Sequence, residues 1–145
     1  VRTQLRQRRI EVTVRRAEPL PPVSATVRHV YQIVLNLVLN AVDAMSQGGE
    51  LTLITRHVSA AREVEVDVAD SGPGISEEML PRLFDPFRSE SDEAGTGLGL
   101  FVTYGLVREY RGRIRVDSRP GKGTRFTFAL PLWEGGDGVA PGGEP

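Results

Sequence analysis

The sequence predicts one α+β domain: a two-layer sandwich in which a mixed, mostly antiparallel sheet is covered on one face by about three helices. Apolar and polar residues alternate in several short stretches, as they do in half-buried strands. Two longer stretches with helical spacing lie between them, without a regular strand-helix-strand order, and the last two strands form a hairpin. At 145 residues, of which 39% are hydrophobic, the chain can build one ordinary core.

The first half of the chain is expected to place a long helix after a single strand. Ile10, Val12 and Val14 alternate with polar neighbours, which predicts a half-buried strand. A proline-rich break follows, and apolar spacing then predicts a helix that begins at Ser24 or Thr26 and continues to Met45. A Ser-Gln-Gly-Gly turn ends this helix and leads into the next strand.

Two further strands are predicted in the middle of the chain. The first covers residues 51–57, and after a tight loop at 59–62 the second contains three valines that alternate with Glu63, Glu65 and Asp67. One face of the second strand is therefore expected to be core, and the acidic face is expected to meet solvent.

Turns and loops are expected to dominate residues 70–94. Residues 70–74 form a glycine-rich turn, and a short helical stretch is predicted from Glu77 with Ser76 as its N-cap. Residues 88–94 have no hydrophobic period and are expected to form a mobile loop.

The C-terminal part is expected to contain a second helix and a hairpin. The helix begins at Leu98 and ends at Gly112, and its apolar positions at helical spacing are Leu100, Phe101, Tyr104, Val107 and Tyr110. The hairpin pairs a strand containing Ile114 and Val116 with one whose inward face is Phe126, Phe128 and Leu130. The predicted boundaries are the end of a linker at 1–9, the domain at 10–132 and a disordered tail at 133–145, which is rich in glycine and proline.

Composition excludes several functions. The formal net charge of −1 disfavours nucleic acid as a partner, and the six arginines among residues 1–16 are interpreted as a solvated face. The absence of cysteine excludes disulfides and thiolate metal sites. No apolar run approaches the roughly 20 residues of a membrane span. We expect a cytoplasmic domain excised from a larger protein, with no direct membrane insertion, whose parent can still be membrane-anchored.

The first feature with chemical potential is a polar stripe on the long helix. Asn36, Asn40 and Asp43 fall at i, i+4 and i+7, and Gln32 extends the stripe backward on a helix that is otherwise almost entirely apolar. Unpaired amides in a core cost about 1–3 kcal/mol each, so these side chains need partners. A bound ligand and a polar network within the core are both open explanations.

The second feature is Asp70-Ser-Gly72-Pro-Gly74-Ile75, directly after a predicted strand. The glycines allow close approach of a ligand, and the carboxylate can accept a hydrogen bond from an exocyclic amine such as that of adenine. Read alone, the segment is equally an ordinary turn.

The third feature is Gly95-Thr96-Gly97-Leu98-Gly99-Leu100, which opens a helix where free N–H groups and the helix dipole favour phosphate. It is no Rossmann fingerprint, because no strand precedes it and Leu100 occupies the third glycine position. The Gly-Lys-Gly-Thr segment at 121–124 is no P-loop, because it lies in a hairpin turn and Val116 replaces the first glycine.

The fourth feature is Leu83-Phe84-Asp85-Pro86-Phe87, in front of the predicted mobile loop. Its two aromatic residues can anchor the base of a flexible lid. Packing against the edge of the core is an equally open explanation.

Taken in this order, the four segments resemble the GHKL family of ATP-binding domains, which includes sensor histidine kinases, type II topoisomerases, mismatch-repair ATPases and a class of heat-shock chaperones. The resemblance covers roughly residues 10–132. It implies the GHKL ATP-binding fold, with ATP and Mg²⁺ as the bound cofactors.

The resemblance also implies roles for individual residues. Asn40 would coordinate Mg²⁺, Asn36 and Asp43 would lie at the phosphates and the waters of the metal, and Asp70 would read the adenine amino group. Further nucleotide-contacting residues that it implies are Gly72, Gly74, Ile75, Phe87, Arg88, Gly95, Thr96, Gly97, Leu98, Gly99 and Thr124.

Residue 36 separates the branches of the family. Topoisomerase and mismatch-repair members have a glutamate there as the base that activates water, whereas Asn36 is an amide with no useful basicity. The short lid, the Phe-Asp-Pro-Phe segment and the Gly-Thr-Gly-Leu-Gly-Leu run look like the histidine kinase branch. Arg88-Ser89 departs from it, since histidine kinases often have a lysine or threonine pair there.

The resemblance therefore implies a protein-histidine kinase, with Asn36 counted among its catalytic residues. His29 and His57 are the only histidines of the chain, and both are interpreted as structural. The implied partners are a dimerisation and phosphoacceptor domain of the same protein, whose histidine receives the γ-phosphate, and a response regulator. A hydrolysing GHKL ATPase and a degenerate docking module without catalysis are the alternatives.

Overall fold

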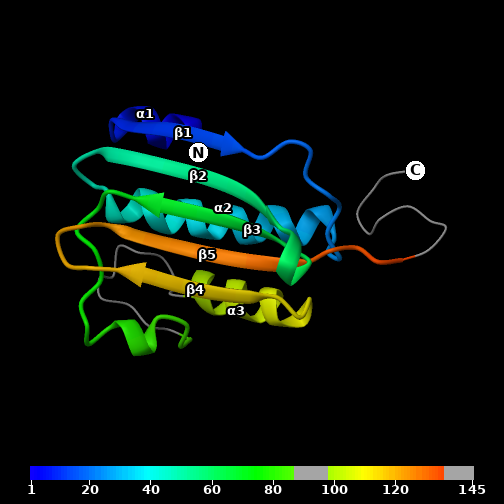
Figure 1. The fold of residues 1–145 in the computed structure, drawn as a ribbon. Coiled ribbons are helices and arrows are strands. Elements are labelled where there is room, and N and C mark those ends of the chain that lie inside the picture. The colour runs from blue at the N-terminus through cyan, green and yellow to red at the C-terminus, as the bar shows by residue number, and fades with distance from the viewer. Residues whose placement is uncertain (87–97, 136–145) are drawn as a thin grey trace.

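The computed structural model describes residues 1–86 and 98–135, and they form a five-stranded sheet with helices on one face (Figure 1). The strands are β1 (Ile10–Arg16), β2 (Gly49–Val58), β3 (Glu63–Asp70), β4 (Arg113–Ser118) and β5 (Thr124–Pro131). The helices are α1 (Arg2–Gln7), α2 (Val27–Ala44) and α3 (Gly99–Glu109), with short 3₁₀ turns at η1 (Ser59–Ala61) and η2 (Leu80–Arg82).

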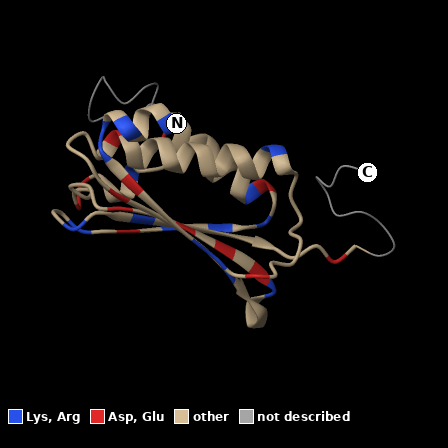
Figure 2. Cartoon of the chain, turned by 90° about the horizontal axis from the view of Figure 1, so that it is seen from above, with Lys and Arg blue, Asp and Glu red and all other residues tan. Residues whose placement is uncertain are grey.

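The sheet has the order β1-β2-β3-β5-β4, so β1 and β4 are its edges. The β1–β2 pair is parallel, and the three other pairs are antiparallel. A view from above shows the helices on one side of the twisted sheet and the opposite face open (Figure 2). The predicted two-layer α+β class, with its mixed and mostly antiparallel sheet, is confirmed.

The core lies between α2, α3 and the three inner strands. Ile33 and Leu37 of α2 are fully buried in the same core cluster as Phe126 and Phe128 of β5, which confirms the predicted inward face of the last strand. Helix α2 begins after Thr26, whose hydroxyl accepts a hydrogen bond from the backbone N–H of His29 at 3.3 Å. Of the two predicted starts of this helix, the threonine is therefore the N-cap.

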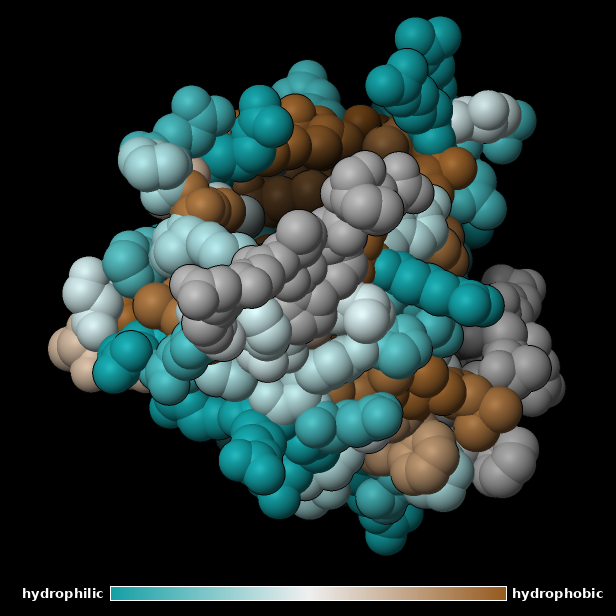
Figure 3. Space-filling view, turned by 90° about the vertical axis from the view of Figure 1, so that its right-hand side faces the viewer, coloured by the Kyte–Doolittle hydropathy of each residue, from teal (hydrophilic) through white to brown (hydrophobic). Residues whose placement is uncertain are grey.

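The prediction that β1 is half-buried was wrong for most of the strand. Val12 and Val14 are 43% and 53% exposed, and only Ile10 at the start of β1 is buried. The reason is that β1 is an edge strand, while α2 packs on β3 and leaves the helix-side face of β1 uncovered. Apolar surface is accordingly visible near the top of the molecule, the side on which β1 lies (Figure 3).

The predicted apolar face of α3 also needs correction. Phe101 and Tyr104 were counted on its apolar face but are 44% and 38% exposed, because the buried face runs through Leu100, Thr103 and Val107. The short helical stretch predicted from Glu77 is present as a turn at residues 77–79 followed by the 3₁₀ helix η2. The predicted cap is present at the start of this stretch, because the Ser76 hydroxyl accepts a hydrogen bond from the Met79 N–H at 3.3 Å.

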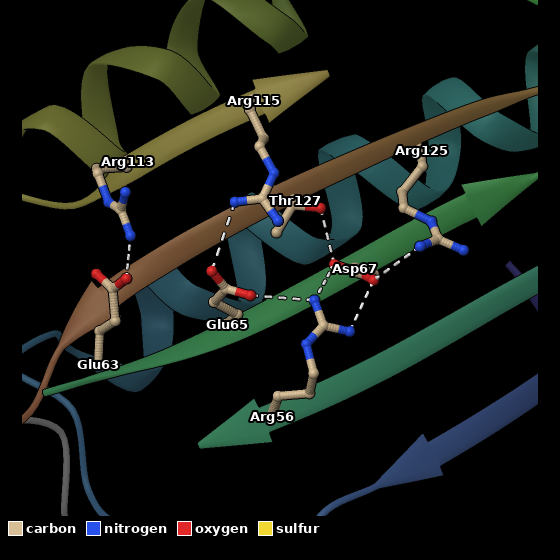
Figure 4. A network of polar contacts seen from close by, with 8 residues as sticks. All are labelled: Arg56, Glu63, Glu65, Asp67, Arg113, Arg115, Arg125 and Thr127. Carbon is tan, nitrogen blue, oxygen red and sulfur yellow. Dashed lines mark hydrogen bonds and ion pairs between the residues drawn. The ribbon is translucent and has the colours of Figure 1, made fainter. Parts of the chain in front are cut away.

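The acidic face of β3 is buried, contrary to the prediction that it meets solvent. Asp67 has no exposed surface, although it lies on the open face of the sheet (Figure 4). The Arg56 guanidinium donates to both of its carboxylate oxygens at 2.8 and 2.9 Å, and Thr127 donates at 2.8 Å. Burial opposes the charged form, but these hydrogen bonds outweigh it and lower the pKa of Asp67.

Arginines of the edge strand β4 also cover the acidic face of β3. Arg113 pairs with Glu63, and Arg115 lies 3.5 Å from Glu65. Both reach across β5 at Ala129 and Thr127, whose short side chains leave room for them. Alternation along one strand could not predict this burial, because the covering side chains come from other strands.

No helix within residues 1–86 and 98–135 has the length and apolar character needed to cross a bilayer.

Candidate functional site

Most of the predicted site residues that the structure describes gather at one end of the sheet. The C-terminal end of α2, the end of β3, the start of β5 and the start of α3 all lie at the left-hand end in Figure 1. Their sequence positions are far apart, and the alternating directions of α2, β3, β5 and α3 bring them together. Phe87, Arg88, Gly95, Thr96 and Gly97 lie outside the described residues.

The polar stripe on α2 is present, but its three members have different surroundings. The Asn36 side-chain amide donates to the Thr103 hydroxyl at 3.2 Å and, at the longer distance of 3.4 Å, to the carbonyl of Gly99. Asn40 is half-buried one turn further along. Asp43 is exposed, and one of its oxygens lies 3.6 Å from the guanidinium of Arg8. The polar-network explanation therefore applies to Asn36, because its side-chain hydrogen-bond partners belong to α3.

Asp70 is buried at the end of β3. Its Oδ1 accepts a hydrogen bond from the backbone N–H of Gly72 at 2.9 Å. Burial raises the pKa of Asp70, while the backbone hydrogen bonds from Gly72 and Thr124 act in the opposite direction. No arginine or lysine pairs with this carboxylate among the residues that the structure describes. Within the described part of the chain, it is a buried acceptor without a compensating cation.

The glycines around Asp70 are required by the packing of two turns. Gly74 has φ +79°, and a Cβ there would lie 2.1 Å from the carbonyl oxygen of Arg119. Gly123 has φ +84°, and a Cβ there would lie 2.1 Å from the carbonyl oxygen of Asp70. The turn after β3 therefore packs backbone against backbone on the β4–β5 turn.

Gly72 is constrained by a different neighbour. A Cβ on it would lie 2.9 Å from Oδ1 of Asp70 and 3.1 Å from the carbonyl of Ala44 at the end of α2. This close approach joins the Asp70 turn to the polar stripe of α2. The segment is thus more than an isolated turn, since it connects α2, β3 and the hairpin.

Thr124 lies beside Asp70, as the Cα partner of Asp70 in the β3–β5 pairing. Its hydroxyl is 2.8 Å from that of Ser118, which also accepts from the backbone N–H of Ile75 at 2.8 Å. Sequence reasoning missed Ser118. The available signal was the hairpin register, because Ser118 pairs directly with Thr124.

Leu98 is half-buried, and Gly99 is the exposed first residue of α3. A Cβ on Gly99 would meet nothing within 4 Å, so packing among the described residues does not explain this glycine, in contrast to Gly74 and Gly123. No side chain of the described residues caps the N-terminus of α3. Its first backbone N–H groups are the kind of donor that phosphate accepts from.

The aromatic segment that precedes the undescribed residues 87–97 packs against the core. Leu83 is buried, and Phe84 stacks on Tyr104 with ring centroids 5.2 Å apart and meets Phe126 edge-on at 6.4 Å. Of the two open explanations, packing at the edge of the core describes Phe84. Phe87 lies outside the described residues.

The two histidines lie apart from this end of the sheet. His29 contacts the Tyr110 hydroxyl through Nδ1 and so connects the start of α2 to the end of α3. His57 is exposed near the end of β2. Both positions agree with the interpretation of these residues as structural.

Comparison with known proteins defines the class. Residues 25–134 match the family described as histidine kinase-, DNA gyrase B- and HSP90-like ATPase, and the chain belongs to this family. Its relatives place it in the histidine kinase branch. It is 37% identical over 136 residues to the sensor kinase CckA of Brucella abortus. It is 42% identical over 132 residues to the adaptive-response sensory kinase SasA of Parasynechococcus marenigrum, and 41% over 125 residues to the sensor histidine kinase ZraS of Klebsiella oxytoca.

Solved structures agree with this assignment. The catalytic domain of the histidine kinase ThkA, in a nucleotide-free form, superposes with a TM-score of 0.79 at 29% identity, over 90% of this chain and 84% of that one. Full-length ShkA in complex with AMPPNP gives the same TM-score and identity, over 90% of this chain and 27% of that one. The chain is the catalytic ATP-binding domain of a histidine kinase.

The chain corresponds to only part of its sequence relatives. The three alignments cover 84%, 88% and 86% of this chain but 14%, 34% and 27% of the respective relatives. The activity and partners of a whole kinase are therefore matters for proposal.

Proposed function

We propose that this domain binds Mg²⁺-ATP at the end of the sheet where α2, β3, β5 and α3 meet. In this proposal it presents the γ-phosphate to a histidine on a separate dimerisation and phosphoacceptor domain of the same protein. That histidine then passes the phosphoryl group to a response regulator. The observation that carries the proposal is the meeting, at one place, of a buried carboxylate that pairs with no cation of residues 1–86 and 98–135, a stripe of amides and the N-terminus of α3.

Asp70 is suited to recognise adenine. A buried carboxylate gains from an N–H donor, and the exocyclic amine of adenine is such a donor. Guanine presents a carbonyl oxygen at the corresponding place, which would face the carboxylate unfavourably. Thr124 and Gly72 hold the Asp70 carboxylate through their backbone N–H groups, so its position is fixed before a ligand arrives.

The donor chemistry of the α2 stripe fits Mg²⁺. Amide oxygens are hard ligands, and Mg²⁺ usually takes one or two ligands from protein and the rest from phosphates and water. Asn40 would provide one such oxygen, with Asn36 and Asp43 next to the phosphates and the metal's waters. When bound, Mg²⁺ neutralises charge on the phosphates.

Transfer rather than hydrolysis is the expected chemistry. Phosphoryl transfer depends mainly on positioning and on charge stabilisation. Asn36 stands where a hydrolysing relative would need a base, and an amide has no useful basicity with which to activate a water molecule. The domain would therefore hold ATP and leave its γ-phosphate for an external acceptor.

Isothermal titration calorimetry of this chain tests the proposal. ATP with Mg²⁺ should bind in the micromolar to millimolar range, and GTP should bind more weakly. Labelled phosphate from γ-labelled ATP should appear on the histidine of the parent's phosphoacceptor domain when the two are mixed. No binding at millimolar ATP would refute the proposal, and steady phosphate release by this domain alone would favour the hydrolysing alternative.

A further inference from the structure

The environment of Asn36 determines which way round its side-chain amide lies. Two groups of α3 face this amide: the carbonyl of Gly99 and the hydroxyl of Thr103. A carbonyl can only accept. The hydroxyl has a single hydrogen, which it donates to the Gly99 carbonyl at 2.8 Å, so it too can only accept from Asn36.

The nitrogen of the amide must therefore point at α3. The Nδ2 group donates to both acceptors, and the reversed amide would place Oδ1 against two other oxygens without a proton between them. Oδ1 is consequently turned away from Thr103 and Gly99. Oδ1 is therefore the hard oxygen ligand that Asn36 can provide, on the same helical stripe as Asn40.

We infer that Thr103 is a positioning residue for Asn36, and that its hydroxyl keeps Oδ1 directed to Mg²⁺ or to water in the metal's hydration shell. Thr103 has no exposed surface, so its hydroxyl is shielded from competing water. It also connects the stripe on α2 to the first turn of α3. This inference rests on the proposed function, but the amide orientation itself does not.

The substitution Thr103→Val isolates the hydroxyl, because valine has nearly the same shape and cannot accept the hydrogen bond. Thr103→Ser retains the hydroxyl and should restore the wild-type behaviour. Thr127→Val is the matched control: Thr127 is also buried and its hydroxyl is also bonded, but to Asp67 on the opposite face of the sheet. A purely structural effect of losing a buried hydroxyl would appear in both valine variants.

The first measurement is ATP affinity with and without Mg²⁺ by calorimetry. In Thr103→Val the ratio of the two affinities should fall about fivefold, the equivalent of one ordinary hydrogen bond, while metal-free ATP binds as in the wild type. Thr103→Ser and Thr127→Val should keep the wild-type ratio. An unchanged ratio in Thr103→Val, or an equal fall in Thr127→Val, would overturn the inference.

The second measurement needs no nucleotide. The side-chain amide protons of Asn36, followed by ¹⁵N NMR in the ligand-free protein, should be slow to exchange in the wild type and in Thr103→Ser. They should shift and exchange faster in Thr103→Val. If the wild type fails to bind ATP, the proposed function fails, and this measurement still decides the amide orientation. If ATP binds with Mg²⁺ but the Asn36 protons are indifferent to Thr103, only the inference fails.

Discussion

Asp70 and Thr124 are directly opposed in the β3–β5 pairing, and the backbone N–H of Thr124 helps to hold the buried Asp70 carboxylate. Thr124 in turn contacts Ser118, which anchors the backbone N–H of Ile75. A single antiparallel register thus builds the proposed adenine end from a strand terminus and a hairpin more than fifty residues apart in sequence. A substitution of Asp70 or Thr124 should therefore affect both segments.

Asp70→Asn should weaken ATP binding by roughly ten- to a hundredfold, because it removes a charged acceptor for the adenine amine. The preference for ATP over GTP should shrink as well. Calorimetry with both nucleotides checks this. Asp117→Asn is the control, since Asp117 is exposed on the opposite face of the sheet near the same end. Equal losses in both variants would contradict the role of Asp70.

Asp70→Asn should weaken ATP binding but increase the stability of the fold at pH 7. Burial raises the pKa of Asp70, so the folded state holds its proton more tightly than the unfolded state. The contribution of this carboxyl to stability is therefore lost as pH rises above 3.8, and the loss is complete once pH exceeds the folded-state pKa of Asp70. Asp70→Asn should be the more stable protein at pH 7, with an advantage that disappears below pH 3.8 in urea titrations. A less stable variant at pH 7 would contradict this.

Asn40→Ala should reduce Mg²⁺-dependent ATP affinity roughly tenfold or more, and leave metal-free ATP binding nearly unchanged, because the side chain is proposed to act on the metal. Calorimetry at several Mg²⁺ concentrations measures both. Gln32→Ala on the same helix is the control: Gln32 is exposed two turns earlier and should show the wild-type Mg²⁺ dependence. A uniform loss with and without metal would assign Asn40 to phosphate or to folding instead.

Gly123→Ala should destabilise the fold by about 2 kcal/mol or more and weaken ATP binding with it. A Cβ at Gly123 would collide with the carbonyl of Asp70 and separate the two packed turns. Gly121 has nearly the same backbone conformation, with φ +78°, but nothing lies within 4 Å of its would-be Cβ. Gly121→Ala should therefore show only the strain of about 1 kcal/mol. Thermal unfolding compares the two, and equal costs would show that the turns are not tightly packed.

Asp67→Asn should lower the free energy of unfolding by about 1–3 kcal/mol at pH 7, since it leaves the Arg56 guanidinium without its main partner. The low pKa of Asp67 means that its contribution is complete above pH 3.8 and is lost as pH falls through the lower, folded-state value. Urea titrations from pH 7 to pH 2 measure the difference. ATP affinity should stay unchanged, because Asp67 lies on the face away from α2. Arg56→Met, which removes the cation, should raise the pKa of Asp67, because burial then has less to oppose it.

Much of the fold followed from local patterns. Alternation predicted the strands, helical spacing predicted α2 and α3, and glycine runs predicted the turns, because each depends on residues a few positions apart. The pattern was misleading where burial depends on distant neighbours. Val14 alternates like a core strand but lies at a sheet edge, and Glu65 alternates like a surface strand but lies under arginines.

For the site, the sequence by itself determined which residues have the necessary chemistry: the carboxylate of Asp70, the amides of the α2 stripe and the glycine run before α3. Only the tertiary structure decided how they are held. Thr103 lies 67 residues from Asn36, and Gly123 lies far along the chain from the Asp70 carbonyl that it packs against. Such contacts are set by strand register and by the docking of α3 on α2, which join segments that no local spacing relates.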